Sequence, residues 1–246
     1  MRHLLIAFSA ATFLVSTAHA DNVNVAVAAN FTDAANEIAA AFAEATDHEA
    51  ILSFGATGQF YTQITQGAPF EVFLAADDER PTLAVNEGYG VAGTVFTYAI
   101  GQLVLYSIEP GKVTGAETLT AGEFKQIAIA NPETAPYGKA AVETMQALGV
   151  YEALQPKIVQ GQNIGQTYQF VETGNAEIGF VALGQVSQTD VGSRWIVPQE
   201  HYAPIKQDAV LLKNGENNPA ATAFIEFLKG DAASAIIEKY GYALDR

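Results

Sequence analysis

Four short loops of this chain place hydrogen-bond donors where a strand-like segment passes into a helix-like one. The loops are centred on Asn30, Thr57, Tyr137 and Ile164. The first N–H groups of a helix have no partner within the helix, and they lie at its positive end. Helix starts therefore attract anions, and each loop is a candidate anion-binding element.

The four loops would act together if they met at one point. About half a positive charge from each helix start would then give about +2, which matches a doubly charged anion. None of the four central residues is acidic, so the loops suit an ion whose oxygens only accept hydrogen bonds. An ordinary strand-to-helix connection gives the same local pattern, and Tyr137 and Ile164 are also plausible as core residues.

Residues for other kinds of chemistry are few. The chain has no cysteine, and beyond the first twenty residues only His48 and His201 remain, so a zinc site or a histidine-based triad lacks parts. The motifs GxSxG and GxxxxGK[ST] are absent. The acidic run 77–79 could hold a cation, although acidic residues are also common in the first turn of a helix. We therefore expect a protein that is not an enzyme.

The segment from Asn22 to Gln63 shows how the first two loops are positioned. Alternating valines at 23, 25 and 27 predict a strand, and apolar residues at helical spacing from 34 to 45 predict a helix for which Asn30 is the expected N-cap. A second apolar run at 50–54 leads through Gly55-Ala56-Thr57-Gly58 into another helix. The pattern predicts two successive strand–loop–helix units.

Strand and helix patterns continue to alternate along the chain in two groups. Two long apolar segments, residues 95–107 and 205–213, are predicted to cross between the groups, the first near Gly101. This layout predicts an α/β protein with two lobes and a ligand cleft between them. The expected division places residues 21–101 and 207–246 in one lobe and residues 102–206 in the other.

The first twenty residues have the pattern of a cleaved signal peptide. Arg2 supplies positive charge, residues 4–15 are an apolar run too short to span a bilayer, and Ala18-His19-Ala20 offers a cleavage site. The net charge of −15 argues against nucleic acid or an anionic membrane as partner. We expect an exported, periplasmic monomer that does not insert into the membrane.

Several longer strings, taken together, resemble the periplasmic molybdate-binding proteins of ABC transporters. They cover essentially the whole chain beyond the first twenty residues: AANFTDA, FGATGQFYTQITQGAPFEVFLAAD, FTYAIGQLVLYS, IANPETAPYGKAA, GQNIGQTYQFVETGNAEIGFVAL and PIKQDAVLL. The resemblance implies a type II periplasmic binding-protein fold that closes over molybdate or tungstate. It also implies a membrane permease as partner, no cofactor, and molybdenum or tungsten only as part of the bound oxyanion.

The resemblance also assigns roles to the four loop residues. Asn30 would donate its backbone and side-chain N–H groups, Thr57 its backbone N–H and hydroxyl, and Tyr137 and Ile164 chiefly their backbone N–H groups. Ala29 and Ala56 are further candidates for backbone contacts. Many members of the family have Ser at the positions of Asn30 and Thr57, and one branch has a ligand-binding Tyr where this chain has Ala182.

Two alternatives stay open at this point. Sulfate makes the same demand on donors, and its exclusion would depend on cavity size, which residue types do not report. A secreted hydrolase of anionic esters could use the same helix starts as an oxyanion cradle, but the sequence offers no evident nucleophile or metal site. The favoured expectation is a solute-binding protein that delivers a tetrahedral oxyanion to an ABC importer.

Overall fold

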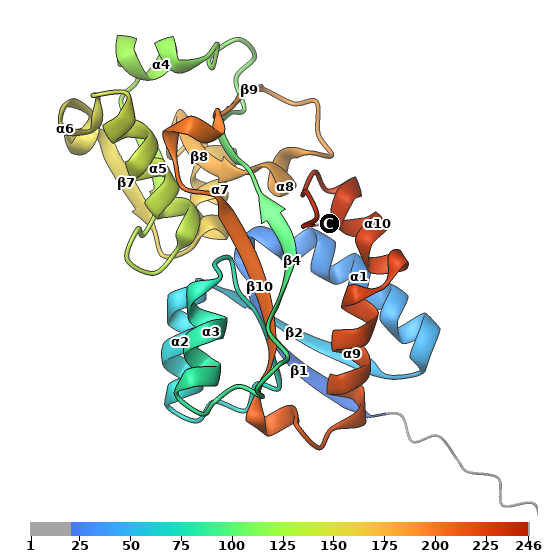
Figure 1. Cartoon of the computed structure of the whole chain (residues 1–246). Coiled ribbons are helices and arrows are strands. Elements are labelled where there is room, and N and C mark those ends of the chain that lie inside the picture. Colours follow the sequence, from blue (N-terminus) through green and yellow to red (C-terminus); the bar gives the residue numbers. More distant parts are fainter. Residues whose placement is uncertain (1–20, 246) are drawn as a thin grey trace, which may run out of the picture.

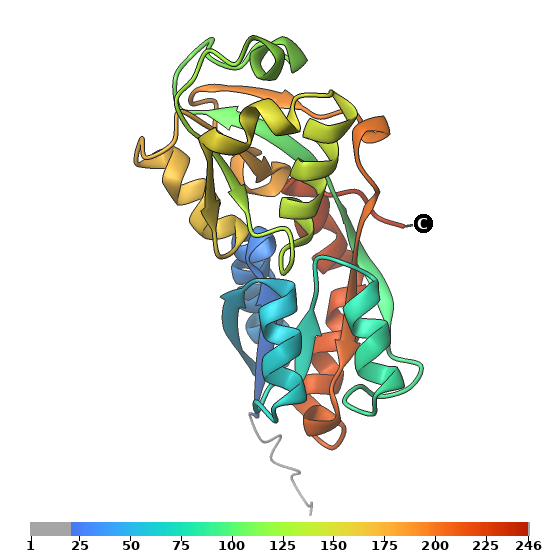
Figure 2. The same ribbon diagram turned by 90° about the vertical axis from the view of Figure 1, so that its left-hand side faces the viewer.

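The computed structural model describes residues 21–245, and the predicted signal peptide at 1–20 lies outside them. The described residues form two lobes, each built on a five-stranded sheet (Figure 1). We call them lobe 1, which holds both ends of the described chain, and lobe 2, which is formed by the middle of the chain. A view turned by 90° shows the lobes one above the other, with loops and helix starts of both facing the boundary (Figure 2).

Lobe 1 has the strand order β2-β1-β3-β10-β4, with β1, β2 and β3 parallel and β10 antiparallel to both of its neighbours. Its strands are β1 (Asn22–Ala28), β2 (Glu49–Gly55), β3 (Val72–Leu74), β4 (Phe96–Gly101) and β10 (Ile205–Leu211). Its helices are η1 (Ala29–Phe31), α1 (Thr32–Thr46), α2 (Thr57–Thr65), α3 (Glu79–Asn86), η4 (Lys213–Gly215), α9 (Pro219–Lys229) and α10 (Asp231–Lys239).

Lobe 2 has the strand order β7-β6-β8-β5-β9, with β6 parallel to β7 and β8, and β5 antiparallel to its neighbours. Its strands are β5 (Leu103–Ser107), β6 (Ile127–Ala130), β7 (Ile158–Gly161), β8 (Ile178–Ala182) and β9 (Ser193–Ile196). Its helices are α4 (Ala116–Ala121), α5 (Pro136–Ala147), α6 (Tyr151–Leu154), η2 (Gln155–Lys157), α7 (Ile164–Glu172), α8 (Leu183–Val186) and η3 (Gln199–His201).

The alternation of side chains along the central strands explains why helices cover both faces of each sheet. In β1, the valines at 23, 25 and 27 belong to a core shared with α1 and α9, whereas Ala26 belongs to a core shared with α2 and α3 (Figure 1). Successive residues of a strand point to opposite faces, so a strand buried on both sides is apolar at nearly every position. Each fully buried Val, Leu, Ile or Phe side chain contributes about 1.5–3 kcal/mol.

The two predicted crossing segments connect the lobes. The first is split between β4 in lobe 1 and β5 in lobe 2, and the chain changes sheet at Gln102. The second returns the chain to lobe 1 as β10, which pairs directly with β4 (Figure 1). The predicted crossing near Gly101 is therefore confirmed, and the paired strands β4 and β10 form the connection between the lobes.

The predicted N-cap of the first helix is wrong. The 3-10 turn η1 lies between β1 and α1, and the N-cap of α1 is Phe31, without a side-chain capping bond. The side chain of Asn30 instead reaches Gln207 and Tyr242, which are far away in the sequence. Hydrogen bonds to these distant residues have therefore taken the place of the helix cap that asparagine favours locally.

Every helix within residues 21–245 falls short of the length and apolar character that a membrane crossing requires.

Asp208 in β10 predicts a pH-dependent stability. It is buried, accepts a hydrogen bond from Thr97 at 2.7 Å, and burial raises its pKa above the ordinary 3.8. Because the folded-state pKa is raised, ionisation of Asp208 lowers stability as pH rises through that value. Asp208→Asn keeps an oxygen for Thr97 and should unfold at higher urea concentration than the parent at neutral pH. The difference should vanish below pH 3.8, and a difference independent of pH would contradict this explanation.

Candidate functional site

The structure brings all four predicted site residues to one small cavity between the lobes. Its volume is about 10 Å³. The loops that line it follow β1 and β2 in lobe 1 and β6 and β7 in lobe 2, at the carboxyl ends of parallel strands, where ligands of open α/β sheets bind. The lining residues are Ala28, Ala29, Asn30, Gly55, Ala56, Thr57, Ala76, Ala135, Pro136, Tyr137 and Ile164.

The cavity is buried and has no ionisable acid or base among its lining residues other than the phenol of Tyr137. Asn30, Thr57, Tyr137 and Ile164 are each less than 5% exposed. Ala29 and Ala56, which the sequence left as further candidates, also line it. The small alanines and Gly55 let the backbone approach closely, so a ligand here would meet main-chain groups more than side chains.

Three backbone N–H groups at this cavity lie in the first turn of a helix. Thr57 is the first residue of α2, Ile164 the first of α7, and Tyr137 the second of α5. Within residues 21–245 none of these three N–H groups has a hydrogen-bond acceptor. Such groups usually find a partner in water or a ligand, and the positive helix end favours an anion.

The hydroxyl of Thr57 is oriented by a backbone bond. Its oxygen accepts a hydrogen bond from the N–H of Ala76 at 2.9 Å. A threonine hydroxyl has one proton and can accept and donate at once. The Thr57 hydroxyl makes no hydrogen bond as a donor within residues 21–245, so Thr57 can offer its proton to a ligand in the cavity.

Asn30 is held differently from what the resemblance implies. Its Nδ2 group donates to Gln207 Oε1 at 2.5 Å and to the Tyr242 hydroxyl at 3.2 Å. The side-chain donors assigned to a ligand therefore already have protein partners. Sequence reasoning missed both partners. Gln207 lies between the charged residues Lys206 and Asp208, so its polarity did not stand out, and Tyr242 gave no signal.

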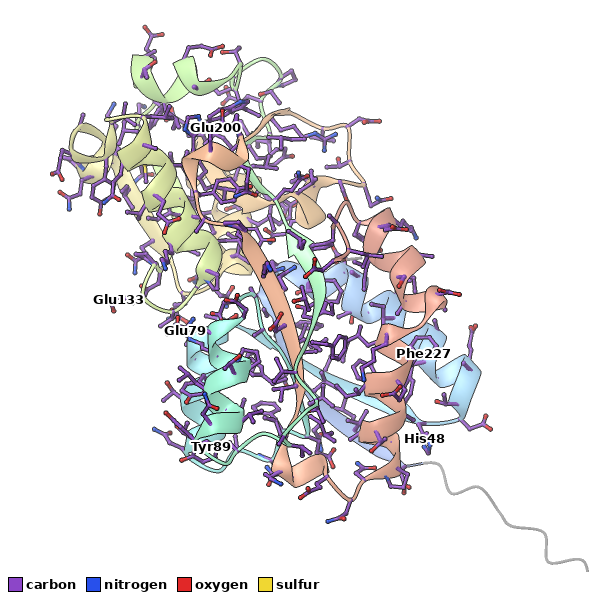
Figure 3. All side chains as sticks on the ribbon, in the orientation of Figure 1. His48, Glu79, Tyr89, Glu133, Glu200 and Phe227 are labelled. Atoms are coloured by element: carbon purple, nitrogen blue, oxygen red, sulfur yellow. The ribbon has the colours of Figure 1, made fainter. Side chains whose placement is uncertain are left out.

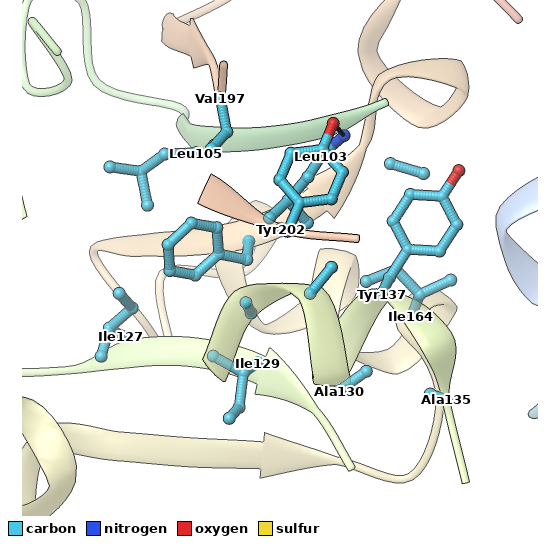
Figure 4. Close-up of a cluster of buried hydrophobic side chains, with 14 of the residues drawn as sticks. Leu103, Leu105, Ile127, Ile129, Ala130, Ala135, Tyr137, Ile164, Val197 and Tyr202 are labelled. Atoms are coloured by element: carbon cyan, nitrogen blue, oxygen red, sulfur yellow. Dashed lines mark hydrogen bonds between the residues drawn. The ribbon is translucent and has the colours of Figure 1, made fainter. Parts of the chain in front are cut away.

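Tyr137 and Ile164 lie side by side at the margin of the lobe 2 core (Figure 4). The Tyr137 hydroxyl lies against Gly101 at the end of β4, where any Cβ would overlap it. Burial raises the pKa of the Tyr137 phenol well above 10, so this group stays neutral and keeps its proton. Tyr137 and Ile164 therefore belong to the lobe 2 core and also line the cavity.

Two hydrogen bonds join the lobes beside the cavity. The N–H of Gly58 in α2 donates to the carbonyl of Thr134 at 2.8 Å. Arg80 Nη2 in α3 donates to the carbonyl of Glu133 at 3.2 Å, and Arg80 is also paired with the Asp77 carboxylate. Both acceptors lie in the loop that leads into α5, so these bonds hold the two sides of the site together.

The acidic run at 77–79 lines an outer groove of about 330 Å³, next to this cavity. Glu79 of lobe 1 and Glu133 of lobe 2 lie near each other at its edge (Figure 3). Asp77 is paired with Arg80, although burial still raises its pKa above the ordinary 3.8. Among the described residues, no three His, Asp or Glu side chains are grouped to hold a metal ion.

The arrangement can bind an anion by neutral donors. Helix starts from both lobes meet at a cavity whose lining lacks a carboxylate, a histidine or a cation. The general base that a hydrolase would need is missing from this lining.

Comparisons with known proteins agree with this geometry. Residues 23–243 match the family described as bacterial extracellular solute-binding protein. The chain is 55% identical to the molybdate-binding protein ModA of Rhodobacter capsulatus (94% of this chain, 92% of that protein), and 51% identical to the molybdate-binding protein ModA of Azotobacter vinelandii (99% and 98%). A solved structure of an Azotobacter vinelandii periplasmic molybdate-binding protein superposes with a TM-score of 0.88 at 38% identity, covering 91% of this chain and 100% of that one. This match confirms the predicted two-lobed fold.

Proposed function

Because the chain belongs to the bacterial extracellular solute-binding proteins, within the family of the periplasmic molybdate-binding proteins, we propose that it captures molybdate or tungstate in the cavity between its lobes. It then delivers the ion to the permease of an ABC importer. The observation that carries this proposal is the meeting of Asn30, Thr57, Tyr137 and Ile164 at one buried cavity without a charged lining residue. Family membership favours a binding protein over a hydrolase.

Charge complementarity supports the assignment of an oxyanion. Each helix start contributes about half a positive charge, and the effect is strong where water is excluded. Molybdate and tungstate offer only acceptor oxygens, so they suit the N–H groups of Thr57, Tyr137 and Ile164 and the Thr57 hydroxyl. The protein's net charge of −15 acts at long range, whereas the bound ion is governed by the nearest dipoles.

The size of the cavity supports closure of the lobes over the ligand. The space between the lobes at this site is only about 10 Å³, roughly one water-sized sphere, and Asn30, Thr57, Tyr137 and Ile164 are each less than 5% exposed. An ion can therefore reach these residues only when the lobes move apart. We therefore expect the lobes to part during ligand uptake, with β4 and β10 serving as the hinge. A monomer exported by the predicted signal peptide is sufficient for this cycle.

The proposal is tested by calorimetric titration of the purified protein with molybdate, tungstate, sulfate and phosphate in turn. We expect one molybdate or tungstate per chain, and binding of sulfate and phosphate weaker by at least about 100-fold, or about 2.7 kcal/mol. Sulfate binding as tight as molybdate binding would establish the sulfate alternative. Turnover of a phosphate or sulfate ester would establish the hydrolase alternative.

A further inference from the structure

A buried polar network underlies the first loop of the cavity. Asn30 donates through Nδ2 to Gln207 Oε1 at 2.5 Å and to the Tyr242 hydroxyl at 3.2 Å. The same hydroxyl donates to the backbone carbonyl of Asn30 at 2.6 Å. Gln207 and Tyr242 therefore hold the side chain of Asn30, and Tyr242 also holds its backbone carbonyl. Neither partner lines the cavity.

One partner lies in a strand that connects the lobes, and the other lies in the C-terminal segment. Gln207 is fully buried in β10, at the irregular register step between Gln207 and Asp208. Tyr242 follows α10, and its ring packs edge-on against Phe31 at 5.2 Å between centroids. On its other side Tyr242 abuts Gly184 of lobe 2, where a Cβ would come within 2.6 Å of Tyr242 Cε2.

The network also contains hydrogen-bonding capacity that the described residues do not use. Asn30 Oδ1, Gln207 Nε2 and the Tyr137 hydroxyl are buried without partners in residues 21–245. Buried polar atoms without partners are rare in folded proteins, because each costs free energy. Two of the three atoms belong to Asn30 and Tyr137, which line the cavity, so this hydrogen-bonding capacity lies next to the proposed ligand site.

We propose that Gln207 and Tyr242 are positioning residues of the oxyanion site, which fix the first ligand loop to the crossing strand β10 and, through Gly184, to lobe 2. This inference rests on the proposed function. The two hydrogen bonds of the Tyr242 hydroxyl hold residue 30 so that the backbone of the Asn30 loop faces the ion. Because Tyr242 also abuts lobe 2, movement of the lobes changes the support of the loop, and ligand binding is coupled to closure.

The test compares Tyr242→Phe and Gln207→Met with two controls. Tyr242→Phe removes the hydroxyl and keeps the ring on Phe31, and Gln207→Met removes the acceptor of Asn30 at similar volume. Tyr240→Phe removes a hydroxyl from the same segment, where it contacts Glu37 rather than the site. Ile237→Val removes a buried methyl group of α10 and controls for a general loss of stability.

The readouts are the molybdate dissociation constant by calorimetry, the urea midpoint of the ligand-free protein and the amide NMR signal of Asn30. We expect Tyr242→Phe and Gln207→Met each to raise the dissociation constant about tenfold, as loss of one or two hydrogen bonds predicts. The Asn30 signal should shift in both, while Tyr240→Phe and Ile237→Val leave the affinity and that signal unchanged.

Other outcomes separate the two proposals. Parent-like affinity in Tyr242→Phe, or an equal loss of affinity in Ile237→Val at a similar urea midpoint, would overturn the positioning role. A parent protein that does not bind molybdate would overturn the proposed function. The Asn30 signal of the ligand-free variants would still decide whether Gln207 and Tyr242 hold the loop.

Discussion

Replacing Thr57 by aspartate is expected to abolish oxyanion binding in a protein that still folds. Thr57 is the first residue of α2 and lines the cavity, so a carboxylate there would face the bound dianion. Two unit charges about 4 Å apart repel by about 4 kcal/mol at the effective dielectric constant of about 20 found near a protein surface. The dissociation constant for molybdate should therefore rise by at least about 1000-fold.

The ligand-free protein should tolerate this substitution. A carboxylate in the first turn of a helix is favourable, and its oxygen can accept the Ala76 N–H that Thr57 accepts now. The urea midpoint should stay close to that of the parent. Thr57→Asn is the matched control, because it has nearly the same shape without the charge, and it should lose at most about tenfold in affinity. Equal losses in the two variants would show that shape rather than charge governs the site.

Gly58→Ala is expected to hold the lobes apart and weaken molybdate binding about 10- to 100-fold. A Cβ at Gly58 would lie 3.0 Å from Thr134 Cα and 3.1 Å from Arg80 Nη2. Overpacking of this kind costs about 1–3 kcal/mol. The cost falls on the closed arrangement, because Thr134 belongs to lobe 2, so the closed state becomes less populated.

The direction of the stability change distinguishes weaker closure of the lobes from a general destabilisation of the fold. Alanine is a better helix former than glycine by about 1 kcal/mol, so the ligand-free variant should unfold at the same or higher urea concentration than the parent while binding more weakly. Small-angle scattering should show less compaction on addition of molybdate. Gln63→Ala, at an exposed position of α2, should change neither compaction nor affinity. Parent-like affinity in Gly58→Ala would show that the contact with Thr134 does not limit closure.

Much of the site could be predicted because helix starts are encoded locally. Apolar periodicity and turn residues predicted the loops at Asn30, Thr57, Tyr137 and Ile164, and each of these residues lies within two residues of the start of a helix. The resemblance of the longer strings to one family predicted the fold, which the structural match confirms. Neither source predicted the 3-10 turn η1, which moves the N-cap of α1 from Asn30 to Phe31, because that outcome depends on distant partners.

The sequence by itself determined the order in which strands and helices alternate and that the four loop centres carry no acidic side chain. These properties depend on neighbouring residues and on residue type. The tertiary structure alone decided that four loops from two lobes meet at one cavity and how small that cavity is. It also decided that Asn30 is held by Gln207 and Tyr242, which lie 177 and 212 residues away in the sequence. The physical reason is that such contacts depend on how whole sheets and helices pack, and no local pattern of residues records that packing.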